Sequence, residues 1–283
     1  MDQLLSQLDE TKLVLDLGCG GGSFDYFRYR CRIVGVDFSF PRDAAFQSRC
    51  ALPHAGFMRG LSHQLPLRDG CVDMVVCNNT MEHFGRLAET LAEIQRVTHD
   101  SSRLYISVPN GYGFDDRLYR FLLLGGGHVN RFSFSSLREL VEATTRFRLR
   151  SFRRLFASFI YLNRPRKEVL IHLPKRMRVY YYLGPQWLLR PGMLVLNLLV
   201  RWVDLLFGTE SSQYGWAFYF ESQAGPVIEK MPNVNVCVNC GAGHTSALLR
   251  SQKKILMVWP RLYRCPSCQA LNVLFQDPHP PSR

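Results

Sequence analysis

The sequence of 283 residues lacks the apolar N-terminal stretch that signal peptides use, so a cytosolic location is expected. Cysteine is not lacking, and the nine present indicate thiols or metal ligands rather than a disulfide framework in such a location. Five of them are scattered and expected to be small buried apolar residues: Cys19, Cys31, Cys50, Cys71 and Cys77. The length suits one large domain and a small one.

Acidic residues are almost missing from one window, residues 146–178, where Glu168 stands alone against eleven arginines and lysines. The chain has a formal net charge of +12, and this window carries most of it, leaving the remainder close to neutral. A charge confined to one segment indicates a local docking surface rather than a diffuse affinity for nucleic acid.

The most informative stretch is an apolar run that passes directly into a glycine loop. Residues 13–22 read Leu-Val-Leu-Asp-Leu-Gly-Cys-Gly-Gly-Gly. Several glycines so close together indicate that a ligand lies against bare backbone, where a Cβ would collide with it. A helix beginning at Ser23 would add free N–H groups and a positive dipole end, which favour a carboxylate or a phosphate.

The next apolar run, residues 32–37, ends in Asp37, at about the 20-residue distance expected of an acid that binds ribose hydroxyls. The preceding spacing is Asp16-x-Gly18-x-Gly20-x-Gly22, which differs from the nicotinamide pattern G-x-G-x-x-G. The chain here resembles the class I S-adenosylmethionine-dependent methyltransferases, in particular the broad group called type 11.

Further stretches carry the same resemblance, which covers roughly residues 10–155 and resumes near 213–221. Residues 60–66 and 69–76 resemble the third and fourth strand region of that group, and residues 80–84, Thr-Met-Glu-His-Phe, match its "LEH" turn. These motifs imply the fold and the cofactor S-adenosylmethionine. They say almost nothing about the methyl acceptor.

The resemblance also implies roles for individual residues. Asp16 would help to organise the amino group of the cofactor, Asp37 would bind both ribose hydroxyls, and Phe38 would lie beside the adenine. Leu61 stands where many relatives have an acid that contacts the adenine amino group, so only backbone is left for that contact. The full set expected to bind the cofactor is Asp16, Gly18, Gly20, Gly22, Asp37, Phe38, Leu61 and Asn78.

Methyl transfer from a sulfonium is an in-line displacement, so a general base is needed only for a protonated acceptor. The candidates are His128, His83 and Asp115 or its neighbour Asp116. His83 belongs to the "LEH" turn, where a structural hydrogen bond is the expected role. His128 lies in a loop after the fifth strand, where relatives line the acceptor pocket.

The alternation of apolar runs and helical patterns predicts a parallel sheet with helices on its faces. The resemblance implies an α/β, Rossmann-like, doubly wound and mostly parallel seven-stranded sheet whose last strand is antiparallel. Strands are expected near 13–17, 32–37, 56–59, 72–77, 102–108, 147–155 and 213–221. Helices are expected near 3–8, 23–29, 42–51, 85–98 and 134–145. The predicted domains are 1–222 (methyltransferase), 223–234 (linker), 235–276 (zinc ribbon) and 277–283 (flexible tail).

Residues 156–212 form a basic and apolar insertion before the last strand, a candidate lid or membrane-docking element. Within it, residues 191–207 are apolar except for the stripe Asn197, Arg201 and Asp204. One interpretation is a helix buried against the catalytic domain or a twin subunit. A second is an interfacial helix beside a basic patch, suited to an anionic membrane. A membrane-spanning helix is disfavoured by the polar residues.

The C-terminal part contains two C-x-x-C pairs separated by 24 residues: Cys237, Cys240, Cys265 and Cys268. Two such turns can present four thiolates to one ion, and four sulfurs favour structural zinc. The segment resembles a zinc ribbon. It is too short to bury a large core, so the metal would supply much of its folding energy.

Three functions of different classes stay open. The first is a methyltransferase for a small-molecule acceptor that is lipid-linked, quinone-like or sugar-derived. The second is an RNA methyltransferase, although residues 77–80 lack the Pro-Pro pair of enzymes that methylate base amino groups. The third is a non-catalytic protein that retains the fold. A homo-oligomer and peripheral binding to a membrane are compatible with the first.

Overall fold

The computed structural model describes residues 1–122, 127–159, 186–256 and 261–277. It divides into two compact units, which are considered separately. Unit 1 comprises Met1–Val108, Val129–Phe152 and Trp216–Glu229, and unit 2 comprises Pro109–His128, Arg153–Gly215 and Lys230–Arg283. Residues 160–178 of the basic window lie outside the described residues.

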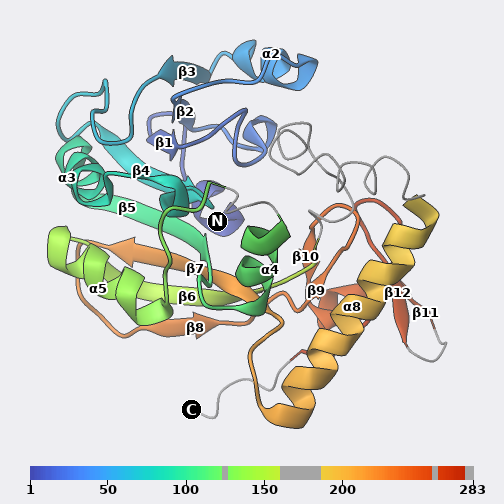
Figure 1. The fold of residues 1–283 in the computed structure, drawn as a ribbon. Coiled ribbons are helices and arrows are strands. Elements are labelled where there is room, and N and C mark those ends of the chain that lie inside the picture. The colour runs from blue at the N-terminus through green and yellow to red at the C-terminus, as the bar shows by residue number, and fades with distance from the viewer. Residues whose placement is uncertain (123–126, 160–185, 257–260, 278–283) are drawn as a thin grey trace. The chain divides into compact units, whose positions relative to one another are not determined.

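The main sheet has the strand order β3-β2-β1-β4-β5-β7-β6-β8, with parallel pairing from β3 through β5 and an antiparallel β7 (Figure 1). The predicted α/β, Rossmann-like fold is therefore confirmed. The strands are β1 (Leu13–Leu17), β2 (Arg32–Asp37), β3 (Ala55–Arg59), β4 (Val72–Asn78), β5 (Thr98–Pro109), β6 (Arg148–Phe156), β7 (Gln213–Glu221) and β8 (Ile228–Lys230).

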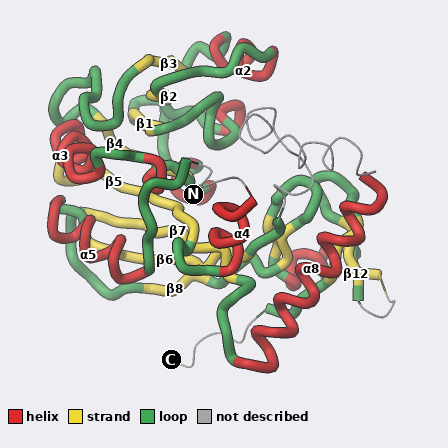
Figure 2. Tube along the Cα trace, viewed as in Figure 1, coloured by secondary structure: helices red, strands yellow, loops and turns green. Residues whose placement is uncertain are grey.

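The core of unit 1 lies between this sheet and two helices, α3 (Leu87–Val97) and α5 (Phe134–Thr144), which run side by side (Figure 2). Both helices turn an apolar stripe to the sheet, because side chains three and four positions apart share one face. The fully buried members of these stripes are Leu91, Ile94, Val97, Leu137 and Val141. Ser133 caps α5 by accepting a hydrogen bond from Ser136 N.

The prediction of a helix at residues 23–29 is wrong. The chain forms only a 3₁₀ turn, η1 (Tyr26–Arg28), capped by Asp25, which accepts a hydrogen bond from Phe27 N. The reason is that the side chains after the glycine loop are recruited inward by a buried acid, as described below. Two further short helices are α1 (Asp2–Leu5) and α2 (Ala44–Cys50). The eighth strand, β8, is not predicted by the sequence pattern.

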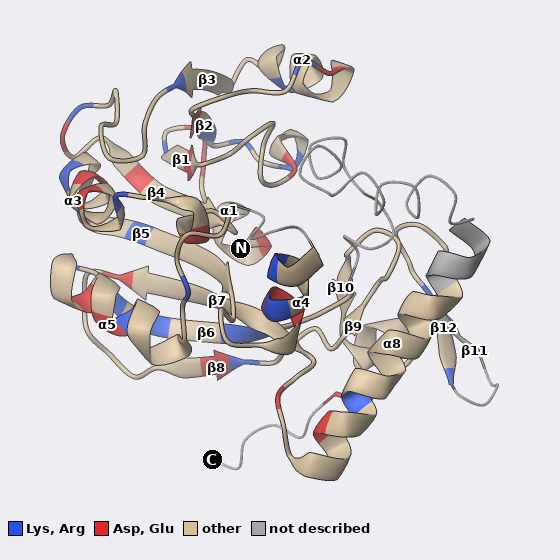
Figure 3. Cartoon of the chain, in the orientation of Figure 1, with Lys and Arg blue, Asp and Glu red and all other residues tan. Residues whose placement is uncertain are grey.

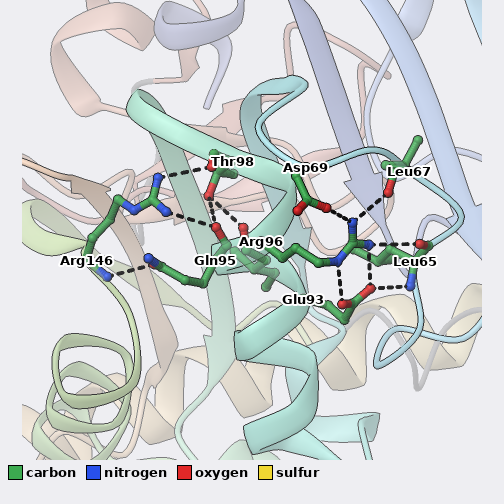
Figure 4. Close-up of polar contacts among 9 residues, drawn as sticks. Leu65, Leu67, Asp69, Glu93, Gln95, Arg96, Thr98 and Arg146 are labelled. Atoms are coloured by element: carbon green, nitrogen blue, oxygen red, sulfur yellow. Dashed lines mark hydrogen bonds and ion pairs between the residues drawn. The ribbon is translucent and has the colours of Figure 1, made fainter.

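Arg96 at the end of α3 holds the loop that leads into β4 (Figure 4). Its guanidinium donates to the carbonyls of Leu65 and Leu67, at 3.1 and 2.8 Å, and to the carboxylates of Asp69 and Glu93. Glu93 also accepts from Leu65 N at 2.6 Å. A planar guanidinium can satisfy several acceptors in a fixed geometry, so this loop is held rigidly on α3.

Unit 2 contains α4 (Phe114–Leu122) and α8 (Gln186–Phe207). The sequence pattern did not predict α4, and it predicted only residues 191–207 of α8. Val200 of α8 packs with Ala157 and Phe159 in a small buried cluster, bordered by Leu118 of α4. Within the described residues, no helix is both long enough and apolar enough to cross a membrane.

The polar stripe of α8 points into unit 2. Asn197 is buried and donates to the carbonyl of Met193 at 2.9 Å. The guanidinium of Arg201 lies 4.0 Å from the ring centroid of Phe156 and 4.8 Å from that of Phe275, and burial lowers its pKa to about 10. Asn197 is thus buried, while Arg201 and Asp204 of the same stripe are only partly exposed to water.

The C-terminal segment of unit 2 forms two small antiparallel sheets, one of β9 and β10 and one of β11, β12 and β13. Its core consists of Leu249 and Tyr263 with two of the four cysteines, Cys237 and Cys265. The elements are β9 (Asn235–Val236), β10 (Gly243–His244), α9 (Ser246–Ser251), β11 (Ile255–Leu256), β12 (Leu262–Arg264) and β13 (Leu271–Val273).

Candidate active site and metal centre

The glycine loop between β1 and β2 contains two glycines with different roles. Gly18 has φ +71°, and an added Cβ would lie 2.8 Å from the Cβ of Thr80, so the packing of the loop on the sheet requires glycine there. Gly20 has φ +53°, but an added Cβ would meet no heavy atom within 4 Å. The backbone at Gly20 therefore borders open space on the side where a Cβ would lie.

Asp16 lies completely buried at the start of this loop. Its carboxylate accepts hydrogen bonds from Ser23 N at 2.9 Å, from Ser23 Oγ at 2.6 Å and from the Tyr26 hydroxyl at 2.7 Å. Burial raises the pKa of Asp16 above its usual value, although these three donors oppose the shift. A cation bound nearby would relieve the cost of the buried charge.

Asp37 at the end of β2 faces the same loop. Its Oδ2 accepts from Gly20 N at 2.7 Å and its Oδ1 from Ser39 N at 3.0 Å, so the carboxylate is oriented and retains lone pairs for hydroxyl donors. The two apolar residues predicted near the adenine are strongly exposed, Phe38 at 73% and Leu61 at 49%. They follow neighbouring strands, β2 and β3.

The end of β4 is tied to the glycine loop. Asn78 donates to the carbonyl of Ser23 at 2.9 Å and accepts from Ser107 Oγ at 2.5 Å. Asn79 has φ +53°, in the left-handed region that non-glycine residues rarely adopt, and strain of this kind is common at functional sites. The hydrogen bonds of Asn78 are structural, and its contact with a cofactor stays a prediction.

The "LEH" turn is the 3₁₀ segment η2 (Met81–His83). The backbone N–H of His83 donates a hydrogen bond to the carbonyl of Thr80 at 2.9 Å, and His83 is exposed. Glu82 is buried, and its carbonyl accepts from the backbone N–H groups of Val129 and Asn130, at 2.8 and 2.9 Å. The turn is thereby fixed to the segment that precedes α5.

In unit 2, His128 is held by Asp116, the second of the two adjacent acids named as candidates from the sequence. Its Nδ1 lies 2.7 Å from Oδ1 of Asp116, whose Oδ2 accepts from Arg120 Nε, and Arg120 also donates to the His128 carbonyl. The Tyr119 ring stacks on the imidazole at 4.7 Å between centroids. Asp115, the predicted candidate, is also buried.

Burial alone would raise the pKa of Asp116, but the hydrogen bonds from His128 and Arg120 outweigh it and hold that pKa below its usual value. Asp116 is therefore an anion that fixes one ring nitrogen of His128 as a hydrogen-bond donor. The sequence left Asp115 and Asp116 as alternatives because it does not reveal which face of α4 meets the following loop.

The four cysteines of the C-terminal segment converge as predicted, with all four Sγ atoms within 4.8 Å of one another. Cys237 and Cys268 are 3.6 Å apart, and Cys240 and Cys265 are 3.7 Å apart. Zn–S bonds of about 2.3 Å in a tetrahedron place sulfurs about 3.8 Å apart, so the cluster fits such an ion. Asn239 N and Asn272 Nδ2 each lie 3.4 Å from Cys237 Sγ, as donors that support a thiolate.

Comparison with known proteins agrees with the geometry of unit 1. Residues 15–106 match the model of a family described as "Methyltransferase domain". The YcgJ protein of Bacillus subtilis has the same fold, with a TM-score of 0.50 and 17% identity over 76% of this chain and 92% of that one. Residues 15–106 therefore belong to the class I S-adenosylmethionine-dependent methyltransferase family.

Two relatives share sequence with part of the chain. An uncharacterized protein of Methanocaldococcus jannaschii is 31% identical over 109 residues, 38% of this chain and 46% of the relative. A probable S-adenosylmethionine-dependent methyltransferase of Mycolicibacterium smegmatis is 30% identical over 134 residues, 46% of this chain and 49% of the relative. The matched region thus spans about half the length of these relatives.

Proposed function

We propose that this chain transfers the methyl group of S-adenosylmethionine to a small-molecule acceptor. The observation that carries the proposal is the open backbone at Gly20, which lies between two oriented acids, Asp16 and Asp37. The cofactor supplies a methyl group already activated by a sulfonium. The name of the relative from Mycolicibacterium smegmatis supports the same reaction class.

In this proposal the loop and the two acids bind the cofactor. Gly18, Gly20 and Gly22 face its methionine end, and the buried negative charge of Asp16 attracts its ammonium group. Asp37 accepts hydrogen bonds from the ribose hydroxyls with the lone pairs that its two backbone donors leave unused. Phe38 lies beside the adenine, which is consistent with its high exposure in the protein alone, and the backbone at Leu61 contacts the adenine amino group. Asn78 completes the set at the end of β4.

His128 is the proposed proton acceptor. The contact with Asp116 orients the imidazole, and Asp116 would stabilise the imidazolium that forms on proton transfer. When bound, the cofactor would supply its activated methyl group to an oxygen, nitrogen or carbon of the acceptor, and His128 would take up the proton that a protonated acceptor loses. His83 and Asp115 are the weaker candidates for this proton.

The acceptor is proposed to be lipid-linked, quinone-like or sugar-derived. The loop after β5, which carries α4 and His128, is the expected place for this acceptor, because ligands of open α/β sheets bind beyond the carboxyl ends of the strands. The four-cysteine cluster is proposed to bind structural zinc, since four thiolates fill all four coordination positions of the ion and leave none open for a substrate.

Two measurements test the function. Incubation of a cell extract with the protein and tritiated S-adenosylmethionine should place label in the lipid or small-molecule fraction. Label in RNA would contradict the proposal, as would a protein that does not bind the cofactor in calorimetry. Asp37→Ala should abolish cofactor binding, whereas Asp25→Ala, which only removes the cap of η1, should preserve it. Equal affinities of the two variants would exclude the role of Asp37.

A further inference from the structure

The outer face of α8 is the largest concentration of exposed apolar side chains in the part of the chain that the structure describes. Of the nineteen exposed large hydrophobic residues, seven lie on this one helix, so they form a continuous surface rather than scattered positions. They are Val195 (53%), Leu199 (53%), Trp202 (55%), Val203 (41%), Leu205 (82%), Leu206 (71%) and Phe207 (74%).

Their spacing makes them one stripe. Val195, Leu199, Trp202 and Leu206 follow one another by four, three and four positions, which places them along one side of an α-helix. Figure 3 shows α8 with few charged residues along its length. From residue 191 to the end of α8, the only ionisable side chains are Arg201 and Asp204.

Both of those side chains are already engaged on the inner side. Arg201 donates to the carbonyl of Val234 at 2.8 Å. Asp204 accepts from Thr209 Oγ1, Ser211 N and Ser212 N at 2.6 to 2.8 Å. The helix therefore has the reverse of the usual arrangement for a surface helix, because its polar groups are satisfied inside unit 2 and its apolar side faces outward.

The charge of unit 2 indicates what covers this face. Unit 2 contains 19 arginines and lysines and 6 acidic residues, whereas unit 1 contains 16 arginines and lysines and 17 acidic residues. Two copies of a unit with such an excess of positive charge repel each other, and an anionic partner is attracted. Phosphate backbones offer no apolar surface to a stripe of leucine, valine and tryptophan. A bilayer of anionic lipids offers both charge and apolar depth.

We infer that α8 lies flat on the surface of an anionic lipid bilayer, with the face from Val195 to Phe207 inserted between the headgroups. Trp202, in the middle of the stripe, suits this depth because an indole ring has an apolar body and a polar N–H. The inference does not depend on methyl transfer, because it rests on α8 and on the charge of unit 2 alone.

The test is co-sedimentation of the full chain with phosphatidylcholine vesicles that contain or lack phosphatidylglycerol. Binding should require phosphatidylglycerol and should weaken as salt is added, because exposed charges are screened. The combined substitution Leu199→Ser, Trp202→Ser and Leu206→Ser should weaken binding by about 30-fold or more, since burial of each large apolar side chain is worth about tenfold or more when complete. All three side chains are exposed, so the variant should keep the thermal unfolding temperature of the parent.

A matched pair of single substitutions isolates the surface. Phe207→Ser removes a 74% exposed ring from α8, and Phe27→Ser removes a 57% exposed ring from unit 1. Only the first should weaken vesicle binding. Trp202→Phe should retain binding but lose the blue shift of tryptophan fluorescence that insertion causes.

Three results would overturn the inference. One is equal binding to vesicles with and without phosphatidylglycerol, or none to either. Another is a dimer in sedimentation that the triple variant dissociates, which would make this face a subunit interface. The third is RNA binding that the triple variant abolishes. Cofactor affinity measured on the same samples separates any of these from a failure of the proposed methyl transfer.

Discussion

Among the residues that the structure describes, unit 1 has one large apolar core, whereas unit 2 has small clusters. In unit 1, strands and helices contribute 22 buried residues to a single cluster. In unit 2, one cluster has three buried members and another has four, of which two are cysteines. Because hydrophobic stabilisation grows with the apolar area removed from water, unit 1 can lose a contact and remain folded. Unit 2 depends on individual contacts, the thiolate cluster above all.

The two units also differ in how they use buried charge. In unit 1, Asp16 is buried beside the loop at which a ligand is proposed to bind, and this burial raises the pKa of Asp16. In unit 2, Asp116 is buried and accepts hydrogen bonds from His128 and Arg120, which lower its pKa. A carboxylate that the protein itself neutralises is a structural group, while one that the protein leaves partly uncompensated is prepared for a cation.

Metal removal should produce the largest difference between the units. Chelation, or Cys265→Ser, should unfold the C-terminal segment, because binding of structural zinc contributes about 10 kcal/mol or more to such small domains. Unit 1 should keep its cofactor affinity. Hydrogen exchange would report loss of protection in β9 to β13 and retention in β1 to β5. Unchanged protection of the C-terminal segment would show that the cysteine cluster does not depend on a metal.

The two glycines of the loop should respond differently to one added methyl group. Gly18→Ala should lower the free energy of unfolding by about 3 kcal/mol, from left-handed backbone strain together with the collision with Thr80. Gly20→Ala carries only the strain, about 1 to 2 kcal/mol. Its larger effect should be on cofactor affinity, a loss of at least about tenfold measured by calorimetry. If Gly20→Ala binds as tightly as the parent, no ligand lies against this backbone.

Asp116→Asn should weaken unit 2 by about 2 kcal/mol near neutral pH, because it removes charged hydrogen bonds from His128 and Arg120. The folded-state pKa of Asp116 is depressed, so its stabilisation is fully present above the unfolded value of about 3.9 and is lost as the pH falls through the folded value. The difference between variant and parent should therefore shrink in strong acid.

Activity provides a second measurement for the same substitution. If Asp116 only orients His128, the variant should retain its KM for the cofactor while kcat and its pH profile change. A variant with the parent's pH profile would contradict the role of this contact in proton transfer.

The smallest effects should come from two surface ion pairs, one in each unit. Arg150 pairs with Glu221 at 3.2 Å, and Arg154 pairs with Glu210 at 3.8 Å. Arg150→Ala should lower stability by about 0.5 kcal/mol. Arg154→Ala should leave it unchanged or raise it slightly, because a charge is removed from a unit that already has excess positive charge. Thermal unfolding at low and high salt would check both, and equal losses would argue against the charge contrast.

The sequence predicted most of unit 1 because its signals are local. The bounds of β1, β2 and β7 match the expected strands, since each is an apolar or alternating run that ends at a polar residue or a glycine. The loop at Gly20 and the four cysteines were recognisable from residue type and spacing alone. These features need no knowledge of distant parts of the chain.

What the sequence did not predict depends on tertiary contacts. The helix expected after the glycine loop is only η1, because Ser23 and Tyr26 turn toward Asp16 instead of continuing a helix. The pairing of His128 with Asp116 follows from the rotation of α4, which adjacent acids in sequence cannot reveal. The stripe on α8 was visible, but a periodic pattern does not say which side of a helix faces the protein.

The position of Arg201 has a consequence for the order in which the chain acquires its structure during synthesis. This guanidinium, in the middle of α8, is covered by Phe275 and hydrogen-bonded to Val234, both encoded later in the chain. Until the ribosome has released that last portion, Arg201 can contact Phe156 but lacks Phe275 and Val234, so the inner side of α8 is incomplete. The inner side of α8 is thus completed only by the segment whose folding is proposed to depend on a metal.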